Sequence, residues 1–176
     1  YYIYAYMEIY KRNELKSGEK INFVVPTGNF GNILAAYYAK KMGLPIDKLI
    51  CASNDNKVLY DFFSTGVYDR NREFFLTISP SMDILVSSNL ERLIYHISGE
   101  DTQKTAELMQ ALNNGGRYEI STNMRTNLKD FCGGYATIEE TKKAIYEVYK
   151  ETGYVMDTHT AVAAAVYEKY FKNDID

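Results

Sequence analysis

The segment that says most about architecture is Phe23-Val24-Val25-Pro26-Thr27-Gly28-Asn29-Phe30-Gly31-Asn32-Ile33. Apolar and β-branched side chains in residues 21–25 predict a strand inside a sheet, and residues 32–42 have helical composition and end before Gly43 and Pro45. The turn between them therefore follows the carboxyl end of a strand. At that place in an open α/β sheet, unpaired N–H groups and the positive end of the helix dipole favour a bound anion.

The glycine spacing of this turn does not by itself define a ligand. It matches neither the dinucleotide fingerprint G-x-G-x-x-G nor the phosphate loop G-x-x-x-x-G-K-[ST]. Gly28 and Gly31 would allow close approach of a ligand to the backbone. An ordinary βα loop, in which the two glycines serve only close packing, explains the spacing equally well.

The composition indicates a folded domain with no charge-driven partner. Of 176 residues, 46% are hydrophobic, and 20 Lys and Arg oppose 23 Asp and Glu for a net charge of −3. We therefore expect no binding to nucleic acid or to a membrane, and a cytoplasmic location. No apolar run approaches the roughly 20 residues of a membrane span. The two cysteines and two histidines are far apart in the sequence, so we expect no metal site and no structural disulfide.

The amino end begins inside an aromatic helical pattern, Tyr1-Tyr2-Ile3-Tyr4-Ala5-Tyr6, with no initiator Met and no N-cap residue. We therefore expect the sequence to be part of a longer protein. Exposed tyrosines of this kind would form a surface for self-association.

The rest of the chain alternates strands and helices. Residues 48–52 and 117–120 are predicted strands, and residues 78–84 a short strand and loop, whereas residues 121–134 show no clear period. Predicted helices cover residues 1–11, 57–64, 89–98, 102–112, 137–151 and 158–170. Two consecutive strand–turn–helix units imply parallel strands, so residues 28–32 and 53–56 should line one crevice. The predicted fold class is α/β, a three-layer open and mostly parallel sheet with helices on both faces.

Other polar residues offer weaker candidates for chemistry. Asp157-Thr158-His159-Thr160 combines an acid, two hydroxyls and an imidazole, but simple capping of the last helix is the first explanation. No G-x-S-x-G elbow supports a serine hydrolase. Arg70, Arg72 and Arg92 could pair with a substrate phosphate, although solvation in a polar turn is the simpler fate of the first two.

Four motifs, in the same order, resemble those of threonine synthases, which are pyridoxal-phosphate enzymes with a tryptophan synthase β-like (fold type II) architecture. They are Val25-Pro26-Thr27-Gly28-Asn29-Phe30-Gly31-Asn32; Ala52-Ser53-Asn54-Asp55-Asn56; Ser79-Pro80-Ser81-Met82-Asp83-Ile84 with Ser88-Asn89-Leu90-Glu91-Arg92; and Asp157-Thr158-His159-Thr160-Ala161-Val162. The resemblance spans nearly the whole chain. It implies a lyase of threonine biosynthesis that converts O-phospho-L-homoserine and water to L-threonine and phosphate.

The resemblance also implies roles for individual residues. Backbone N–H groups of Gly28, Asn29, Phe30, Gly31 and Asn32 would hold the cofactor phosphate. Thr160 would hydrogen-bond the pyridine nitrogen, and a hydroxyl there does not force the ring to stay protonated. The residues expected to approach the substrate are Asn54, Ser81, Asp157 and His159. Thr158 stands where the family often has Pro, which affects the helix start more than the chemistry.

One expected feature of the family is missing. The lysine that forms the Schiff base with the cofactor lies in a Ser/Phe-Lys-Asp context, and no lysine here has that setting; Lys129-Asp130 falls in the wrong region. We therefore expect residues 1–176 to be a carboxyl-terminal part of the cofactor-binding (large) domain, truncated at the amino end and before a final strand, and inactive alone. Two alternatives remain: a non-catalytic phosphate-binding or structural module, and a related lyase such as a dehydratase or cysteine synthase.

Overall fold

The computed structural model describes residues 1–172. Residues 173–176, which belong to the predicted domain, lie outside the described residues. The elements run in the order α1 Tyr2–Lys11, β1 Ile21–Pro26, α2 Gly31–Lys41, β2 Ile46–Ser53, α3 Val58–Thr65, β3 Val67–Asp69, a 3₁₀ turn Pro80–Met82, α4 Leu90–Ile97, α5 Thr102–Gly115, β4 Arg117–Glu119, α6 Thr122–Thr126, β5 Phe131–Tyr135, α7 Ile138–Thr152 and α8 Thr158–Lys172.

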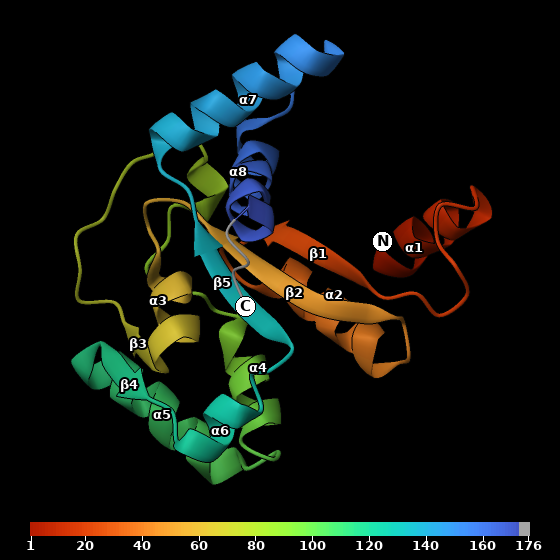
Figure 1. Ribbon diagram of the computed structural model, residues 1–176. Coiled ribbons are helices and arrows are strands. Elements are labelled where there is room, and N and C mark those ends of the chain that lie inside the picture. The colour runs from red at the N-terminus through yellow and green to blue at the C-terminus, as the bar shows by residue number, and fades with distance from the viewer. Residues whose placement is uncertain (173–176) are drawn as a thin grey trace.

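The main sheet has three parallel strands in the order β1-β2-β5. In Figure 1 the helices α7 and α8 lie toward one side of this sheet, and α2, α3 and α4 toward the other. A second sheet pairs β3 with β4 in antiparallel fashion. The predicted α/β fold class, with a parallel sheet covered on both faces, is therefore confirmed.

Two apolar clusters fill the space on the two faces of the main sheet. The larger one includes Leu49 and Cys51 of β2 together with Ile33 of α2 and Phe62 of α3. The smaller one joins Ile50 and Ala52 of the same strand to Val162 and Val166 of α8. Successive β2 side chains thus alternate between the clusters, as the pleat of a strand requires, and both faces are buried as in other parallel sheets.

Most predicted elements are confirmed within one to three residues, but the middle of the chain differs. The strand predicted in residues 78–84 is wrong, because the segment forms only the turn Pro80–Met82. Proline removes a backbone donor, and the side chain of Asp83 bonds the backbone N–H of Thr77 instead of leaving the segment free to pair. The region without a clear period, residues 121–134, contains α6 and most of β5.

Among residues 1–172, no helix is both long and apolar enough to cross a membrane.

Candidate functional site

The turn after β1 leaves six consecutive backbone N–H groups, from Gly28 to Ile33, without an acceptor among residues 1–172. The N–H groups on either side are paired: Thr27 donates to the carbonyl of Ala52 at 2.8 Å, and Leu34 donates to the carbonyl of Phe30 at 3.0 Å. No side chain caps α2. Unpaired donors at the positive end of a helix are suited to bind an anion.

Phe30, at the centre of this turn, has left-handed backbone geometry with φ of 65°. That conformation costs a non-glycine residue about 1–2 kcal/mol. The ring is 1% exposed and lies 5.8 Å from the ring of Phe131 and 6.0 Å from that of Phe63, measured between centroids. Burial of the ring thus holds the backbone in a conformation that it would not otherwise favour, which is common at binding sites.

Both glycines of the turn lie against other parts of the chain. A Cβ atom on Gly28 would be 2.5 Å from the backbone oxygen of Ser81, and one on Gly31 would be 3.3 Å from Nδ2 of Asn89. Glycine is therefore required at residue 28 by close approach of the chain's own backbone, in addition to any ligand.

The turn after β2 lies at the same sheet edge but satisfies its own polar groups. Asn54, which is 2% exposed, accepts the N–H of Asn56 through Oδ1 and donates through Nδ2 to Asp83 Oδ1 at 2.7 Å. The same carboxylate accepts from Asn56 Nδ2 at 3.1 Å and from Oγ1 and N of Thr77 at 2.7 and 2.8 Å. Asn54 is thus a buried residue whose side chain joins its own turn to Asp83, so its polar atoms bond the chain itself.

One polar atom at this edge has no partner among the described residues. Ser53, the last residue of β2, is 2% exposed, and its Oγ makes no hydrogen bond. A buried hydroxyl without a partner is unusual in a folded protein and is often explained by a ligand or water.

The start of α8 brings together three of the predicted residues. Asp157 caps the helix: its Oδ1 accepts the N–H of His159 at 2.9 Å and that of Thr160 at 3.2 Å. Its Oδ2 accepts the hydroxyl of Thr160. The hydroxyl and N–H of Thr160, followed by groups of His159, lower the pKa of Asp157 to about 2. The capping explanation is confirmed, and the cap also orders the Thr160 hydroxyl.

His159 connects this helix start to the turn that carries Ser81. The N–H of Ser81 donates to Nε2 of His159 at 3.3 Å, and Nδ1 of His159 lies 3.2 Å from Asp157 Oδ1. Since Nε2 accepts, it carries the lone pair, and a neutral imidazole places its proton on Nδ1, toward Asp157. The structure therefore links Gly28, Ser81, His159, Asp157 and Thr160 in one chain of contacts.

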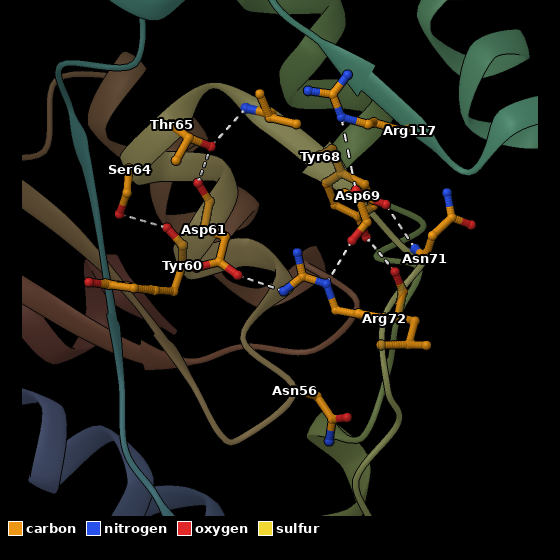
Figure 2. Close-up of polar contacts among 12 residues, drawn as sticks. Asn56, Tyr60, Asp61, Ser64, Thr65, Tyr68, Asp69, Asn71, Arg72 and Arg117 are labelled. Carbon is orange, nitrogen blue, oxygen red and sulfur yellow. Dashed lines mark hydrogen bonds and ion pairs between the residues drawn. The ribbon is translucent and has the colours of Figure 1, made fainter.

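The candidate arginines of the first polar turn are already engaged. Figure 2 shows Arg72 between α3 and β3, where Nη1 bonds Asp61 Oδ2 at 2.6 Å and Nε bonds the carbonyl of Asp69 at 2.7 Å. Arg70 donates to the carbonyl of Asn113 at 3.0 Å. These contacts assign both side chains to local structure.

Sequence reasoning missed the importance of Asp83, Thr77 and Ser87 at this edge. Asp83 joins the two asparagines, and Ser87 bonds the carbonyl of Gly28. A clue was present in residues 77–89, where Thr, Ser, Asp and Asn recur in a segment with no helical or strand period.

The fold and the site define a class: an α/β protein with a run of unpaired backbone N–H groups in the turn between β1 and α2. No family model matches the chain. Sequence comparison with curated proteins narrows this class to one family. The chain is 38% identical to threonine synthase of Saccharomyces cerevisiae over 190 residues, with 100% of this chain and 36% of that protein covered. It is 43% identical to human threonine synthase-like 1 over 171 residues, with 96% of this chain and 23% of that protein covered.

Solved structures agree with the curated relatives. Yeast threonine synthase matches with a TM-score of 0.91 at 36% identity, over 100% of this chain and 37% of that one. A structure described as PLP-bound threonine synthase from Brucella melitensis matches with a TM-score of 0.83 at 41% identity, over 86% of this chain and 32% of that one. The chain belongs to the threonine synthase family. It spans about a quarter to about a third of the length of these relatives.

Proposed function

We propose that residues 1–176 are part of the cofactor-binding domain of a pyridoxal-phosphate-dependent threonine synthase, and that the turn from Gly28 to Asn32 holds the phosphate of the cofactor. The observation that carries the proposal is the run of six unpaired N–H groups from Gly28 to Ile33. The similar threonine synthase from Brucella melitensis, a PLP-bound structure, supports this choice of anion.

The residues at this edge fit such a group. A phosphate ester offers three oxygens as acceptors, and the turn offers adjacent donors together with the positive end of α2. The unpartnered Oγ of Ser53 adds a further polar atom at the carboxyl end of the neighbouring strand. Asn29, Gly31 and Asn32 are exposed, so an anion can reach this side of the turn from solvent.

Thr160 suits the proposed place beside the ring nitrogen. Its hydroxyl is ordered by Asp157 and carries no charge. The hydroxyl has one proton, which it donates to Asp157 here, so it would bond an unprotonated ring nitrogen only by turning that proton from Asp157 to the ring. A neutral partner of this kind does not hold the ring nitrogen in its protonated form, as a carboxylate would. When bound, pyridoxal phosphate supplies an electron sink for carbanions of an amino acid substrate. The Asp157 carboxylate, whose pKa is lowered to about 2 by bonds from Thr160 and His159, is negatively charged at neutral pH.

For the longer protein we propose the reaction of O-phospho-L-homoserine and water to give L-threonine and phosphate, in threonine biosynthesis. We propose that Ser81 and His159 approach the substrate, while Asp157 and Asn54, whose polar atoms bond the chain itself, hold the elements on which those residues lie. Nε2 of His159 accepts the N–H of Ser81. We place the Schiff-base lysine outside residues 1–176, since none of the lysines here has the family setting.

A binding experiment tests the phosphate role directly. Inorganic phosphate should stabilise the chain against thermal unfolding, relative to chloride at equal ionic strength, by about 1.4 kcal/mol at tenfold the dissociation constant. In ¹H–¹⁵N spectra, the amides of residues 28–33 should shift with the same midpoint. Absence of both effects at millimolar phosphate would refute the proposal.

An activity assay tests the substrate. The complete protein that contains this chain should release phosphate and form threonine from O-phospho-L-homoserine. Turnover of serine or O-acetylserine in its place would instead identify a related lyase, and phosphate binding without turnover of any of the three would identify a non-catalytic module.

A further inference from the structure

Two carbonyl groups of the turn from Gly28 to Asn32 accept hydrogen bonds from a segment about sixty residues further along the sequence. Ser87 Oγ donates to the carbonyl of Gly28 at 2.7 Å. Asn89 donates to the carbonyl of Asn29 twice, from its backbone N at 3.1 Å and from Nδ2 at 2.9 Å. Three hydrogen bonds therefore fix two successive peptide groups of the turn.

The peptide geometry converts these bonds into an orientation for the opposite side of the turn. In a trans peptide the C=O and the following N–H point in opposite directions. The carbonyl of Gly28 shares its plane with the N–H of Asn29, and the carbonyl of Asn29 shares its plane with the N–H of Phe30. Holding the carbonyls toward Ser87 and Asn89 thus turns the N–H groups of Asn29 and Phe30 to the other side.

Ser87 and Asn89 together are called the clamp here, and its serine is anchored in the protein interior. Ser87 is 5% exposed, and its N–H donates to Tyr68 Oη at 2.8 Å. Tyr68 is 1% exposed, donates its own hydroxyl to the carbonyl of Leu85 at 3.0 Å and stacks on Tyr118 at 5.3 Å between ring centroids. Burial raises the pKa of Tyr68 to about 12, so this phenol remains a donor across the ordinary pH range.

The turn needs such support because it has little of its own. Phe30 holds a positive φ, and no side chain caps α2. The N–H groups of residues 28–33 also have no acceptor among residues 1–172. Without the clamp, the peptide groups of Gly28 and Asn29 could rotate and lose the arrangement that the anion requires.

We propose that Ser87 and Asn89 are positioning residues for the phosphate site: by holding the carbonyls of Gly28 and Asn29, they preset the N–H groups of Asn29 and Phe30 and so determine the affinity for the phosphate group. The inference rests on the proposed function of the turn. It assigns the affinity for phosphate to residues that act through the backbone of the turn.

The test compares inorganic phosphate affinity among matched variants, measured by amide shifts of residues 29–33. Ser87→Ala and Asn89→Ser each remove a side-chain donor to the turn, and serine at residue 89 keeps a good residue before α4. We expect each to weaken phosphate binding about tenfold, the equivalent of about 1.4 kcal/mol. Ser87→Thr keeps the hydroxyl and should restore binding. Ser88→Ala, at an exposed neighbour, is the control and should bind as the wild type does.

A second readout separates positioning from general damage. Binding of pyridoxal, which lacks the phosphate, should be equal in the wild type and in the variants, whereas pyridoxal phosphate should lose affinity in step with inorganic phosphate. If Ser87→Ala does not fold, the test compares the phosphate affinities of Asn89→Ser and Ser87→Thr with that of the wild type. Equal phosphate affinity in folded variants and wild type would overturn the clamp alone. A wild-type chain that binds no phosphate would overturn the proposed function, and the clamp with it.

Discussion

The two turns that follow β1 and β2 lie at one edge of one parallel sheet, yet they treat their polar groups in opposite ways. The turn after β1 leaves the N–H groups of Gly28 to Ile33 unpaired. The turn after β2 bonds Asn54 and Asn56 to each other and to Asp83. The same topology thus serves an external ligand in one turn and internal structure in the other.

Both turns contain asparagines, and the difference lies in what their side chains bond. Asn54 Oδ1 accepts the N–H of Asn56 within its own turn, whereas Asn32 Oδ1 accepts the hydroxyl of Tyr2 and leaves the backbone donors beside it unpaired. A binding site at the end of a parallel sheet therefore needs more than the right position. It also needs neighbours that leave its donors free.

The largest effect should come from removing the carboxylate that holds the turn after β2. Asp83→Ala removes the acceptor for four hydrogen bonds from Asn54, Asn56 and Thr77, and leaves partly buried donors unpaired. We expect a loss of about 3 kcal/mol in the free energy of unfolding, measured with urea. Asp47→Ala, at an exposed aspartate, should change the same quantity by less than about 0.5 kcal/mol. A loss of under about 1 kcal/mol for Asp83→Ala would show that the network does not stabilise this turn.

The next effect concerns the open turn. Gly28→Ala places a Cβ atom 2.5 Å from the backbone oxygen of Ser81, which cannot move aside as a flexible side chain would. We expect a loss of about 2 kcal/mol in unfolding free energy, together with weaker phosphate binding measured by titration. Gly115→Ala is the matched control, because a Cβ there meets nothing within 4 Å and lies in a helix, where alanine is neutral or stabilising. If Gly28→Ala changes the unfolding free energy and the phosphate affinity no more than Gly115→Ala does, the close approach of Ser81 does not require glycine at residue 28.

Sequence pattern predicted the strands and helices around both turns but not β5. Phe131-Cys132-Gly133-Gly134-Tyr135 contains two glycines, which strand patterns disfavour. The structure explains them: a Cβ on Gly133 would lie 3.1 Å from Tyr60 Cα, and one on Gly134 would lie 2.4 Å from Val166 Cγ1. Helices on both faces need those side chains to be absent, and that requirement is tertiary, so no local pattern contains it.

The site shows the same division between local and long-range information. The cap by Asp157 and the turn at Gly28 follow from nearby residues and were predictable. The bond from Ser81 to His159, and those from Ser87 and Asn89 to the turn, join segments about sixty to eighty residues apart. Motif order indicated which segments matter, but only the packed chain shows which atoms meet.

A smaller effect should separate helices that carry their own cap from α2, which has none. Thr137 and Glu140 form a capping box at the start of α7. Thr137→Ala should lower the unfolding free energy by about 1 kcal/mol and leave phosphate affinity unchanged. The control is Thr152→Ala, at the other end of the same helix. The Thr152 hydroxyl donates to the carbonyl of Val148 and accepts the N–H of Tyr154, both at exposed positions, so its loss should cost less than about 0.5 kcal/mol. A change in phosphate affinity with Thr137→Ala would mean that the two helix starts are coupled.

The smallest effect is a pH dependence at the start of α8. The pKa of Asp157 is lowered from 3.8 to about 2 by bonds from Thr160 and His159. Because the folded value lies below the unfolded one, this stabilisation is complete above about pH 4 and is lost as pH falls toward 2. The carboxylate is 62% exposed, so solvent screening limits the effect to less than about 1 kcal/mol. Asp157→Asn keeps a good cap but cannot ionise, so the difference in unfolding free energy between wild type and variant should shrink between pH 4 and 2, while Asp47→Asn shows no such trend. A difference that is constant across this window would mean that Asp157 orders Thr160 without any contribution from its charge.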